Sequence, residues 1–461
     1  MMSETALQEL RREVRGPVLL PGESGFEQEI AAYNLATIHR PDVVAGVADA
    51  ADVVAAMKWA AAHRVPVAVQ ATGHGADTVM EGGLLMATSR MQDFDFDPEK
   101  RVARVGAGVK WRKVIDAIVP HGLMGLNGST TDVSVVGYTL GGGLPVMGRV
   151  FGFAADHVRS LDVVTPDGQL RRVDAGHEPD LFALLRGGKG NLGIVTSMTF
   201  DLFPLQDFYA GGIFYPGSDA EEVLTAFGRW ALTVPDNVST SVALLRLPEL
   251  EFIPEPMRNQ FLVHLRYCYV GDAEAGARTL APMRAVSHPV ADMVGPMTYQ
   301  DIDQVHLDPP VPLPFLHAGE FLRGFDADVV GALLQQAGPG IDCPLLEIEI
   351  RLMGGAYAKA SEVLDAVSGR DEPFHLVLVG LAASPDIDAI SGSIKSIFKA
   401  LAPYASGRTF VNMHGVPGDE TDRARAWSPE VYTRLVQAKS RYDPDNLLRF
   451  QHAIGQPVVP A

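Results

Sequence analysis

The chain has 461 residues, of which 47% are hydrophobic, so it can bury a large core divided among two or three domains. It carries 38 basic and 56 acidic side chains, and this formal net charge of −18 repels phosphate backbones and argues against a nucleic-acid partner. The two cysteines, Cys268 and Cys343, lie far apart without the spacing of metal ligands. We therefore expect neither a disulfide scaffold nor a metal site.

The start of the chain predicts a helix and no targeting segment. Residues 1–14 form an amphipathic run without the apolar core of a secretory leader. No apolar run approaches the roughly 18 residues needed to span a membrane. We expect a soluble, cytoplasmic protein without a membrane partner.

The first block, from about residue 40 to residue 205, alternates short β-rich runs with helices and glycine turns. The pattern predicts a strand at residues 42–47, a helix at residues 51–62 and a second strand at residues 64–69. These three elements form one βαβ unit.

A loop that contains His74 follows the second strand of this unit. Gly73 and Gly75 flank the histidine, and glycines let a backbone pass close to a phosphate or a planar ring. A histidine held there can be a ligand, a base or a covalent anchor. Taken alone, the loop is more typical of an ordinary turn with an incidental histidine.

Two further segments of the first block suggest a nucleotide site. Residues 128–143 are rich in glycine and in small hydroxylic side chains, so their backbone amides can bind a diphosphate without a cationic side chain. Residues 151–196 contain a hairpin around residues 163–170 and a second glycine-rich run. Neither a Walker lysine nor a Rossmann G-x-G-x-x-G follows the first strand, so another fold must hold the nucleotide.

The middle block, from about residue 206 to residue 401, predicts an α+β domain. Strands are expected at residues 261–269, 345–352 and 375–379, and a helix at residues 272–280. The second of these strands alternates cleanly. It places Leu346, Ile348, Ile350 and Leu352 on one face, and Glu347, Glu349 and Arg351 on the other. The polar face is a candidate to look onto a ligand.

The last block, from about residue 404 to the end, predicts a strand at residues 409–412, a helix at residues 429–440 and a turn at residues 442–446. No internal repeat or low-complexity linker separates the three blocks, so we expect them to pack tightly together.

Four segments, in this order and spacing, resemble the FAD-linked oxidases of the vanillyl-alcohol-oxidase/PCMH superfamily, specifically the berberine-bridge-enzyme-like branch. They are the His74 loop, residues 128–143, residues 151–196 and residues 442–450, and the resemblance runs from about Pro17 to Ile454. It implies an α+β fold with a two-subdomain PCMH-type FAD-binding domain at residues 1–205. It also implies a substrate-binding domain at residues 206–404, with an antiparallel sheet flanked by helices, and a C-terminal segment at residues 405–461 that returns to the FAD domain.

The resemblance further implies that FAD is the cofactor and that His74 is bonded to the flavin 8α carbon. The other implied contacts are Ala71, Thr72, Gly73, Gly75 and Ala76 at the pyrophosphate, Thr130, Val133, Ser134, Gly137, Gly142 and Gly143 in the second loop, Val195 near the adenine end, and Asn446 and Gln451 near the flavin pyrimidine edge. Many relatives have asparagine where Gln451 and Ala453 stand, and Asn446 is equally typical of a cap.

Two positions of the second loop refine this expectation. Many relatives carry a cysteinyl flavin link where Thr130 stands here, so we expect no cysteinyl link and a single tether through His74. Val133 falls where the family has a gate residue over the flavin, and a valine there resembles the oxygen-reactive members. It favours O2 as electron acceptor, although an ordinary buried valine explains the residue equally well.

A third position bears on the reaction. Relatives that oxidise alcohols often use a tyrosine base where Phe410 stands, two residues before Asn412, and a phenyl ring cannot accept a proton. Tyr138, inside the second loop, is interpreted as a packing residue. The candidate catalytic residues are Glu349, His414, Tyr267 and Glu347, with Arg351 as a partner that holds a glutamate charged. For each of them a solvated or salt-bridged role remains the alternative.

The leading hypothesis is an FAD-dependent oxidase that removes a hydride from a C–H next to nitrogen or oxygen in a small or natural-product substrate, with O2 as acceptor. The alternative is a flavin-containing cyclase or isomerase of natural-product biosynthesis without net oxidation, which Phe410 keeps open. A third hypothesis is a binding protein without catalysis. The sequence defines neither the substrate nor the oligomeric state.

Overall fold

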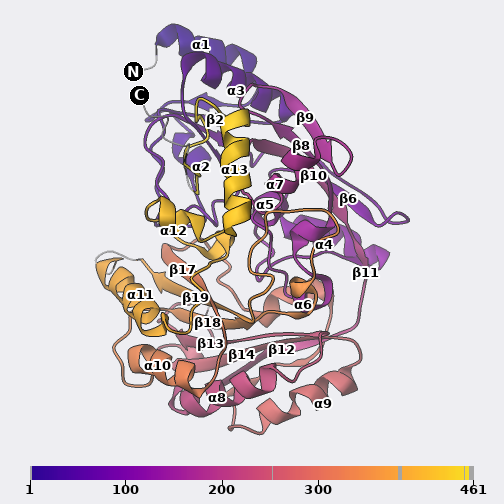
Figure 1. Ribbon diagram of the computed structural model, residues 1–461, viewed down its shortest axis with the longest axis vertical. Coiled ribbons are helices and arrows are strands. Elements are labelled where there is room, and N and C mark those ends of the chain that lie inside the picture. Colours follow the sequence, from indigo (N-terminus) through magenta and orange to yellow (C-terminus); the bar gives the residue numbers. More distant parts are fainter. Residues whose placement is uncertain (1–2, 252, 383–386, 451, 456–461) are drawn as a thin grey trace.

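The computed structural model describes residues 3–251, 253–382, 387–450 and 452–455. Two halves lie one above the other along the long axis of the molecule (Figure 1). The upper half contains two small sheets with their helices, and the lower half contains one large antiparallel sheet. The expected α+β class is confirmed. No helix within these described ranges is long and apolar enough to cross a membrane.

The first subdomain of the upper half is built around a small, mainly parallel sheet. Its elements are α1 (Glu4–Glu13), β1 (Val18–Leu19), α2 (Phe26–Ile30), β2 (Val43–Gly46), α3 (Ala50–His63), β3 (Val67–Gln70) and β4 (Leu84–Ala87). The sheet order is β1-β2-β4-β3, and β2 and β3 both run parallel to β4. Asp49 caps α3 by accepting hydrogen bonds from two backbone N–H groups of its first turn. The predicted βαβ unit is confirmed, with β4 lying between its two strands.

The second subdomain is built around a five-stranded antiparallel sheet. Its elements are β5 (Phe94–Asp97), β6 (Val102–Gly106), α4 (Trp111–Ile118), β7 (Leu123–Met124), α5 (Val135–Leu140), α6 (Gly148–Phe151), β8 (Val158–Val164), β9 (Leu170–Asp174), α7 (Pro179–Leu185), β10 (Ile194–Asp201) and β11 (Phe203–Pro204). The sheet order is β5-β6-β10-β8-β9, and β8 and β9 form the predicted hairpin. Apolar side chains of α4, α5 and α7 share one core with this sheet, while α3 contacts β8 and β10.

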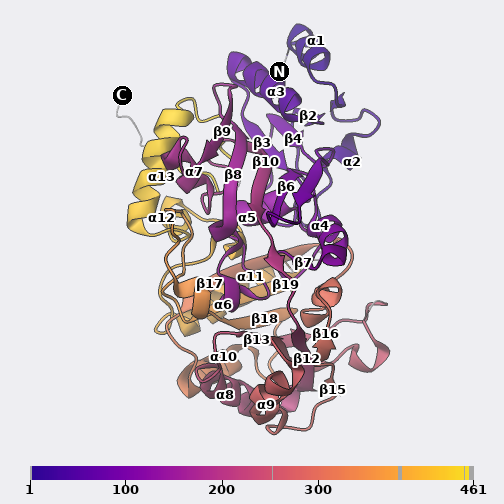
Figure 2. The same ribbon diagram turned by 90° about the vertical axis from the view of Figure 1, so that its right-hand side faces the viewer.

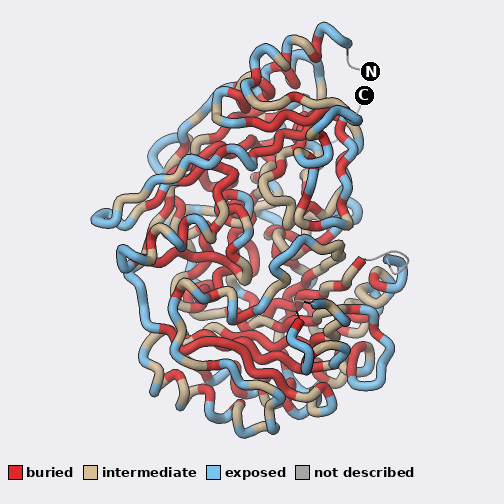
Figure 3. Tube along the Cα trace, turned by 180° about the vertical axis from the view of Figure 1, so that it is seen from behind, coloured by how far each residue is buried: buried red, intermediate tan, exposed pale blue. Residues whose placement is uncertain are grey.

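The lower half is one broad antiparallel sheet with helices on its far face. Its elements are β12 (Phe208–Pro216), α8 (Ala220–Ala231), β13 (Val238–Arg246), β14 (Phe261–Val270), α9 (Ala273–Arg284), β15 (Ala291–Asp292), β16 (Gly295–Met297), β17 (Phe315–Leu322), α10 (Ala327–Ala337), β18 (Glu347–Leu352), β19 (Phe374–Leu381) and α11 (Ile387–Leu401). The sheet order is β15-β12-β14-β13-β18-β19-β17, and β16 pairs with β12. Helices α8 to α10 lie on the side away from the upper half (Figures 1 and 2). Most residues of the strands β12, β13, β14, β18 and β19 are buried, and the lower half of Figure 3 shows them as red bands.

The alternation predicted for β18 is confirmed, with one exception. Ile348, Ile350 and Leu352 pack into the core that the helices share with the sheet. Leu346 was expected on the same face, but it precedes the strand and lines a cavity instead. Because β18 begins at Glu347, the strand periodicity does not extend to Leu346.

The C-terminal segment contains α12 (Glu420–Ala424) and α13 (Pro429–Tyr442), and α13 packs against α7 of the upper half. The predicted strand at residues 409–412 is wrong. Phe410 precedes a short 3-10 helix, η7 (Val411–Met413), and the Thr409 N–H donates to the Arg425 carbonyl instead of a strand ladder. The other short 3-10 helices are η1 (Val119–His121), η2 (Ala154–His157), η3 (Gly217–Asp219), η4 (Glu255–Met257), η5 (Tyr299–Val305) and η6 (Gly355–Ala358).

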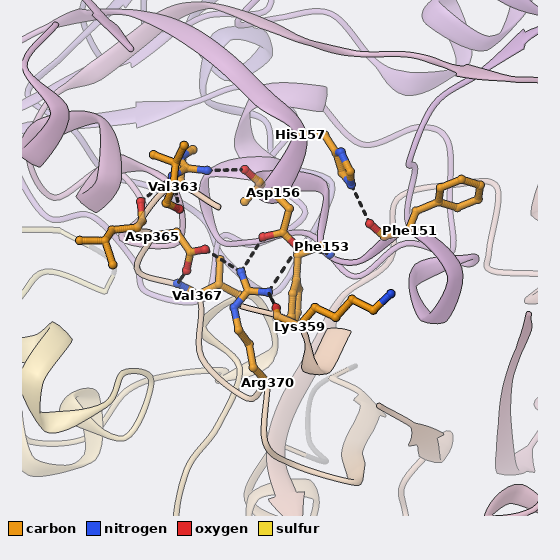
Figure 4. A network of polar contacts seen from close by, with 12 residues as sticks. Phe151, Phe153, Asp156, His157, Lys359, Val363, Asp365, Val367 and Arg370 are labelled. Carbon is orange, nitrogen blue, oxygen red and sulfur yellow. Dashed lines mark hydrogen bonds and ion pairs between the residues drawn. The ribbon is translucent and has the colours of Figure 1, made fainter. Parts of the chain in front are cut away.

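Arg370 and Arg186 tie the halves together through the segment that follows η6, and Figure 4 shows the contacts of Arg370. The Nη2 atom of Arg370 lies 2.5 Å from a carboxylate oxygen of Asp156 in the upper half and 2.6 Å from one of Asp365. The buried Arg186, at the end of α7, donates to the Val363 carbonyl at 2.9 Å. Because these are charge-assisted hydrogen bonds between partly or fully buried groups, they fix the two halves relative to each other.

Candidate active site

A cavity of about 390 Å³ lies between the upper half and the sheet of the lower half. One side, which we call the glycine wall, is formed by the lining residues of segments 69–76, 128–138 and 189–195. The opposite side, the charged wall, comprises Arg266, His306, Asp308, Glu347, Glu349 and Arg351.

The His74 loop begins where β3 ends, and its shape depends on glycine. Gly73 has φ of +73°, and a Cβ on it would lie 2.6 Å from the Cα of Ala32, so a larger residue does not fit. The turn at Gly73 leads directly into His74. The imidazole stacks on the ring of Tyr33 at 3.7 Å between centroids, and its Nδ1 lies 3.0 Å from the Thr72 hydroxyl. The ring of His74 is therefore held in one orientation.

The imidazole of His74 is neutral and has one free nitrogen. Burial lowers the pKa of His74 to about 4, because a charged ring is poorly solvated there. Within the described part of the chain, the buried Nε2 atom has no hydrogen-bond partner. The backbone N–H groups of Gly73 and Gly75 likewise make no hydrogen bond to any described residue. The loop thus presents unsatisfied polar groups that a ligand can use.

Most of the residues expected to contact the cofactor line this one cavity. They are Ala71, Thr72, Gly73, His74, Gly75, Ala76, Thr130, Val133, Ser134, Gly137 and Val195. The buried Ser134 hydroxyl donates to the Ala107 carbonyl at 2.8 Å, which anchors the second loop to the upper half. Cys268 and Cys343 are free and buried in the lower half, and neither belongs to the cavity lining.

Three of the expected cofactor residues do not line the cavity. Gly142 and Gly143, after α5, have positive φ and pack against the rings of Phe410 and Tyr138 respectively. Asn446 lies in the turn after α13, where its N–H donates to the Asp443 carbonyl. Gln451 lies outside the described residues.

The charged wall is a network of paired side chains on the upper face of the sheet. Ser241 of β13 lies in register with Arg266 on one side and Arg351 on the other. Glu349 lies 3.1 Å from Arg266 and 3.0 Å from Arg351, and Glu347 lies 2.7 Å from Arg266. Strand alternation therefore brings Arg266, Glu347, Glu349 and Arg351 to one side of the sheet.

The pairing decides the charge state of Glu349. Burial alone raises the pKa of a carboxyl, but Arg351 and Arg266 outweigh it and hold the pKa of Glu349 well below its usual range. Burial likewise opposes the charge of Arg351, but Glu349 raises its pKa above the ordinary value. Glu349 is therefore a permanent carboxylate and a weak base.

Two expected catalytic residues lie elsewhere. Tyr267 belongs to the helix-covered face of β14, where its hydroxyl donates to the Gly276 carbonyl of α9 at 3.0 Å, so its expected place beside the cofactor is wrong. The alternation of the strand turns its neighbour Arg266 to the cavity instead. His414 is also absent from the cavity lining. It is buried beside Asp422 and the ring of His452. The 3-10 helix η7 stands where a strand was expected, so strand alternation does not place the side chain of His414.

The structure adds residues that the sequence patterns did not identify. Asp308 follows Leu307, whose φ of +58° turns the buried His306 and Asp308 into the cavity while the Leu307 side chain stays exposed. Burial raises the pKa of Asp308 to about 6, against the opposing effect of Arg266. Lys189 of the glycine wall also lines the cavity. The sequence offered one signal for His306 and Asp308, because both stand just before a proline-rich run.

The aromatic and apolar lining completes the cavity. Phe410 is buried and lines it together with Asn412, whose Nδ2 donates to the Tyr138 carbonyl at 2.9 Å. Tyr138 also lines the cavity, and burial raises the pKa of its hydroxyl well above the ordinary value. The hydroxyl therefore stays protonated, which agrees with the interpretation of Tyr138 as a packing residue. Val377 and Val379 add apolar surface from β19.

The residues of the glycine wall fit a flavin nucleotide. Free backbone N–H groups suit a diphosphate, and the unpartnered imidazole nitrogen of His74 suits a bond or contact to a planar ring. The carboxylates and arginines of the opposite wall suit a polar substrate.

Comparisons with known proteins agree with this geometry. The family model described as FAD binding domain matches residues 41–174, and the model described as Berberine and berberine like matches residues 417–455. An uncharacterized FAD-linked oxidoreductase, YvdP of Bacillus subtilis, is 24% identical over 96% of this chain and 98% of its own length. (R)-6-hydroxynicotine oxidase of Paenarthrobacter nicotinovorans is 23% identical over 95% of this chain and 96% of its own.

The fold has solved counterparts. The structure of BBE-like 1 of Physcomitrella patens superposes with a TM-score of 0.86 at 19% identity, covering 98% of this chain and 99% of that one. Fold and site together define an FAD-dependent oxidoreductase. The resemblance to the berberine-bridge-enzyme-like branch of the vanillyl-alcohol-oxidase/PCMH superfamily, inferred from four segments, is confirmed, because the chain contains a matched FAD binding domain and a matched berberine-like region.

Proposed function

We propose that this protein is an FAD-dependent oxidase that removes a hydride from a C–H next to nitrogen or oxygen in a small or natural-product substrate and uses O2 as electron acceptor. The observation that carries the proposal is that the glycine wall and the charged wall face one cavity, so a flavin on one side meets a polar substrate on the other. A relative named (R)-6-hydroxynicotine oxidase supports a small organic substrate.

A bound flavin would supply the hydride acceptor. We assign His74 as its single covalent tether. The support is the neutral imidazole, its free Nε2 atom and its fixed stacking on Tyr33. Thr130 stands where relatives carry a second link, and no cysteine lines the described cavity. Val133 lines the cavity and supports the choice of O2 as acceptor.

We assign Asp308 as the group that accepts the substrate proton. Phe410 has no acidic proton to exchange, and Glu349 is held charged by two arginines, so neither is a suitable base. Asp308 faces the cavity, and its pKa of about 6 lets it accept and release a proton near neutral pH. Arg266 and Arg351, which share Glu349, would orient the substrate.

The alternative is a cyclase or isomerase that holds flavin without net oxidation. Phe410 favours it, because the usual alcohol base is absent at this position. In that case Asp308 would still move a proton, but no hydride would leave the substrate.

The test is anaerobic mixing of the purified flavoprotein with a panel of amines and alcohols, followed by admission of O2. The proposal predicts that at least one substrate bleaches the oxidised-flavin absorbance, and that O2 restores it with release of hydrogen peroxide. A compound that is converted while the flavin absorbance stays unchanged would establish the cyclase or isomerase instead.

A further inference from the structure

Lys189 stands in an unusual backbone position beside the cavity. It lies in the run Gly187-Gly188-Lys189-Gly190 between α7 and β10 and has φ of +58°, in the left-handed region that glycine tolerates and lysine rarely adopts. Its N–H donates to the Leu140 carbonyl at 3.0 Å, which holds the loop in place. A side chain retained at a position that favours glycine points to a use for that side chain.

The side chain of Lys189 reaches the loop that carries His74. A Cβ built on Gly75 would lie 3.6 Å from the Lys189 Nζ atom, so the ammonium lies directly beside the residue that follows His74. Lys189 lines the cavity on the same wall. In the part of the chain that the structure describes, its Nζ makes no hydrogen bond or ion pair. The carboxylate of Asp77, which influences it from a distance, lies 3.5 Å from His317.

A second lysine, Lys439, has a structural role and serves as a comparison for Lys189. Lys439 of α13 is completely buried, and its Nζ donates to the Asn191 carbonyl at 3.1 Å, to Asp443 at 2.6 Å and to the Leu448 carbonyl at 2.5 Å. Each of its three N–H donors has an acceptor. Lys189 lines the cavity, and its Nζ has no acceptor among the residues that the structure describes.

We propose that Lys189 is the counter-cation of the bound flavin nucleotide, with its ammonium beside Gly75 neutralising anionic charge on the cofactor. That charge has two sources, the diphosphate and the negative charge that the flavin ring gains on reduction. Burial lowers the pKa of Lys189 to about 8, opposed in part by Asp77, so the cation is present at neutral pH and is lost as the pH rises through about 8. The inference depends on FAD alone, so it holds for the oxidase and for the cyclase.

The test compares Lys189→Met and Lys189→Arg with a matched control, Lys110→Met. Lys110 is another cation near His74, but it is half-exposed and pairs with Asp132 at 2.7 Å. For each variant we would measure FAD per chain, the flavin midpoint potential, and the dissociation constant of sulfite, a small anionic probe whose adduct places negative charge on the ring.

Each source of charge predicts a different pattern. If the ring is the partner, Lys189→Met keeps its FAD, lowers the midpoint potential and weakens sulfite binding on the order of tenfold. Wild-type sulfite affinity then falls additionally as the pH rises through about 8, and the variant lacks this step. If the diphosphate is the partner, Lys189→Met loses FAD while the loaded fraction keeps its potential. In both cases Lys189→Arg keeps the wild-type FAD content, midpoint potential and sulfite affinity at neutral pH, but it lacks the step near pH 8 because an arginine stays charged there.

The proposal is overturned if Lys189→Met matches Lys110→Met in FAD content, potential and sulfite affinity. Should Lys189→Met fail to fold, the proposal is tested by the pH dependence of sulfite affinity in the wild type and by the properties of Lys189→Arg. Two results together would contradict the proposal. Wild-type sulfite affinity and FAD content would show no step near pH 8, and Lys189→Arg would differ from the wild type in both quantities at neutral pH.

Discussion

The two walls of the cavity differ in whether their polar groups already have partners within the protein. The glycine wall offers unsatisfied groups: free backbone N–H groups, the Nε2 atom of His74 and the ammonium of Lys189. The charged wall has already satisfied most of its own groups, since Glu349 pairs with both Arg266 and Arg351. The first wall is completed by a ligand that brings its own charges, whereas the second is complete without one.

This contrast separates cofactor binding from substrate recognition. A wall with free donors stays costly to bury until its ligand arrives, which suits a cofactor that remains bound. A wall whose charged groups pair with each other keeps its shape when substrate binds and dissociates. Asp308 of this wall faces the cavity and is the group to which we assign the proton transfer.

The largest expected effect comes from breaking the pairing of the charged wall. Glu349→Gln leaves Arg266 and Arg351 without their shared carboxylate, so the free energy of unfolding should fall by about 3–5 kcal/mol, measured by urea denaturation. Glu347→Gln is the control, because this side chain is more exposed and pairs only with Arg266. Equal and small losses in the two variants would contradict the view of a self-paired wall.

The next effect concerns Asp308, the acid of the charged wall that interacts with the Ser129 hydroxyl and forms no ion pair with a described arginine. Asp308→Asn should slow anaerobic flavin reduction by substrate on the order of 100-fold, because the proton acceptor is removed. The wild-type rate should rise as the pH increases through about 6, where Asp308 loses its proton, and the variant should lack this rise. Asp301→Asn, an exposed acid of η5 in the same region, is the control. An unchanged pH profile in Asp308→Asn would exclude its role.

A smaller effect tests the shape of the glycine wall. Gly73→Ala and Gly122→Ala both place alanine at positive φ, but only the first also drives its Cβ into Ala32. Gly73→Ala should therefore be less stable than Gly122→Ala by about 1–3 kcal/mol and should bind less FAD per chain. Equal melting temperatures and equal FAD content would show that the close approach at Gly73 is not required.

The smallest effect concerns acid sensitivity around the cavity. Burial lowers the pKa of His375, which lies in register with Arg351 on β19, to about 3, so the unfolded chain takes up a proton below pH about 6.5 that the folded chain does not. Stability therefore falls with falling pH. His375→Gln should reduce this slope between pH 6.5 and 5 by about 1.4 kcal/mol per pH unit. An unchanged slope in His375→Gln would contradict this account.

The sequence predicted the glycine wall better than the charged wall, for a physical reason. Loop 71–76 and the loop around Val133 act through local backbone geometry, which glycines and small residues encode directly. On the charged wall, Glu349 followed from alternation within one strand. Arg266 and Tyr267 are neighbours on β14, and only the sheet packing decides which of them faces the helices.

The remaining differences also arise from tertiary structure. His414 leaves the cavity because residues 411–413 form a 3-10 helix where alternation indicated a strand. Asp308 reaches the cavity through the left-handed turn at Leu307, a conformation that leucine does not signal. The order and type of most elements were therefore predictable, while the packed structure was needed to show which single side chains reach the cavity.

The central claim is that the glycine wall holds FAD through His74 alone, and the most direct measurement is mass spectrometry of a tryptic digest of the purified flavoprotein. We expect one peptide that contains His74 to carry the flavin mass, and His74→Ala to lose the acid-stable flavin fluorescence of denaturing gels. Flavin on a peptide containing Cys268 or Cys343, or undiminished acid-stable fluorescence in His74→Ala, would contradict this account.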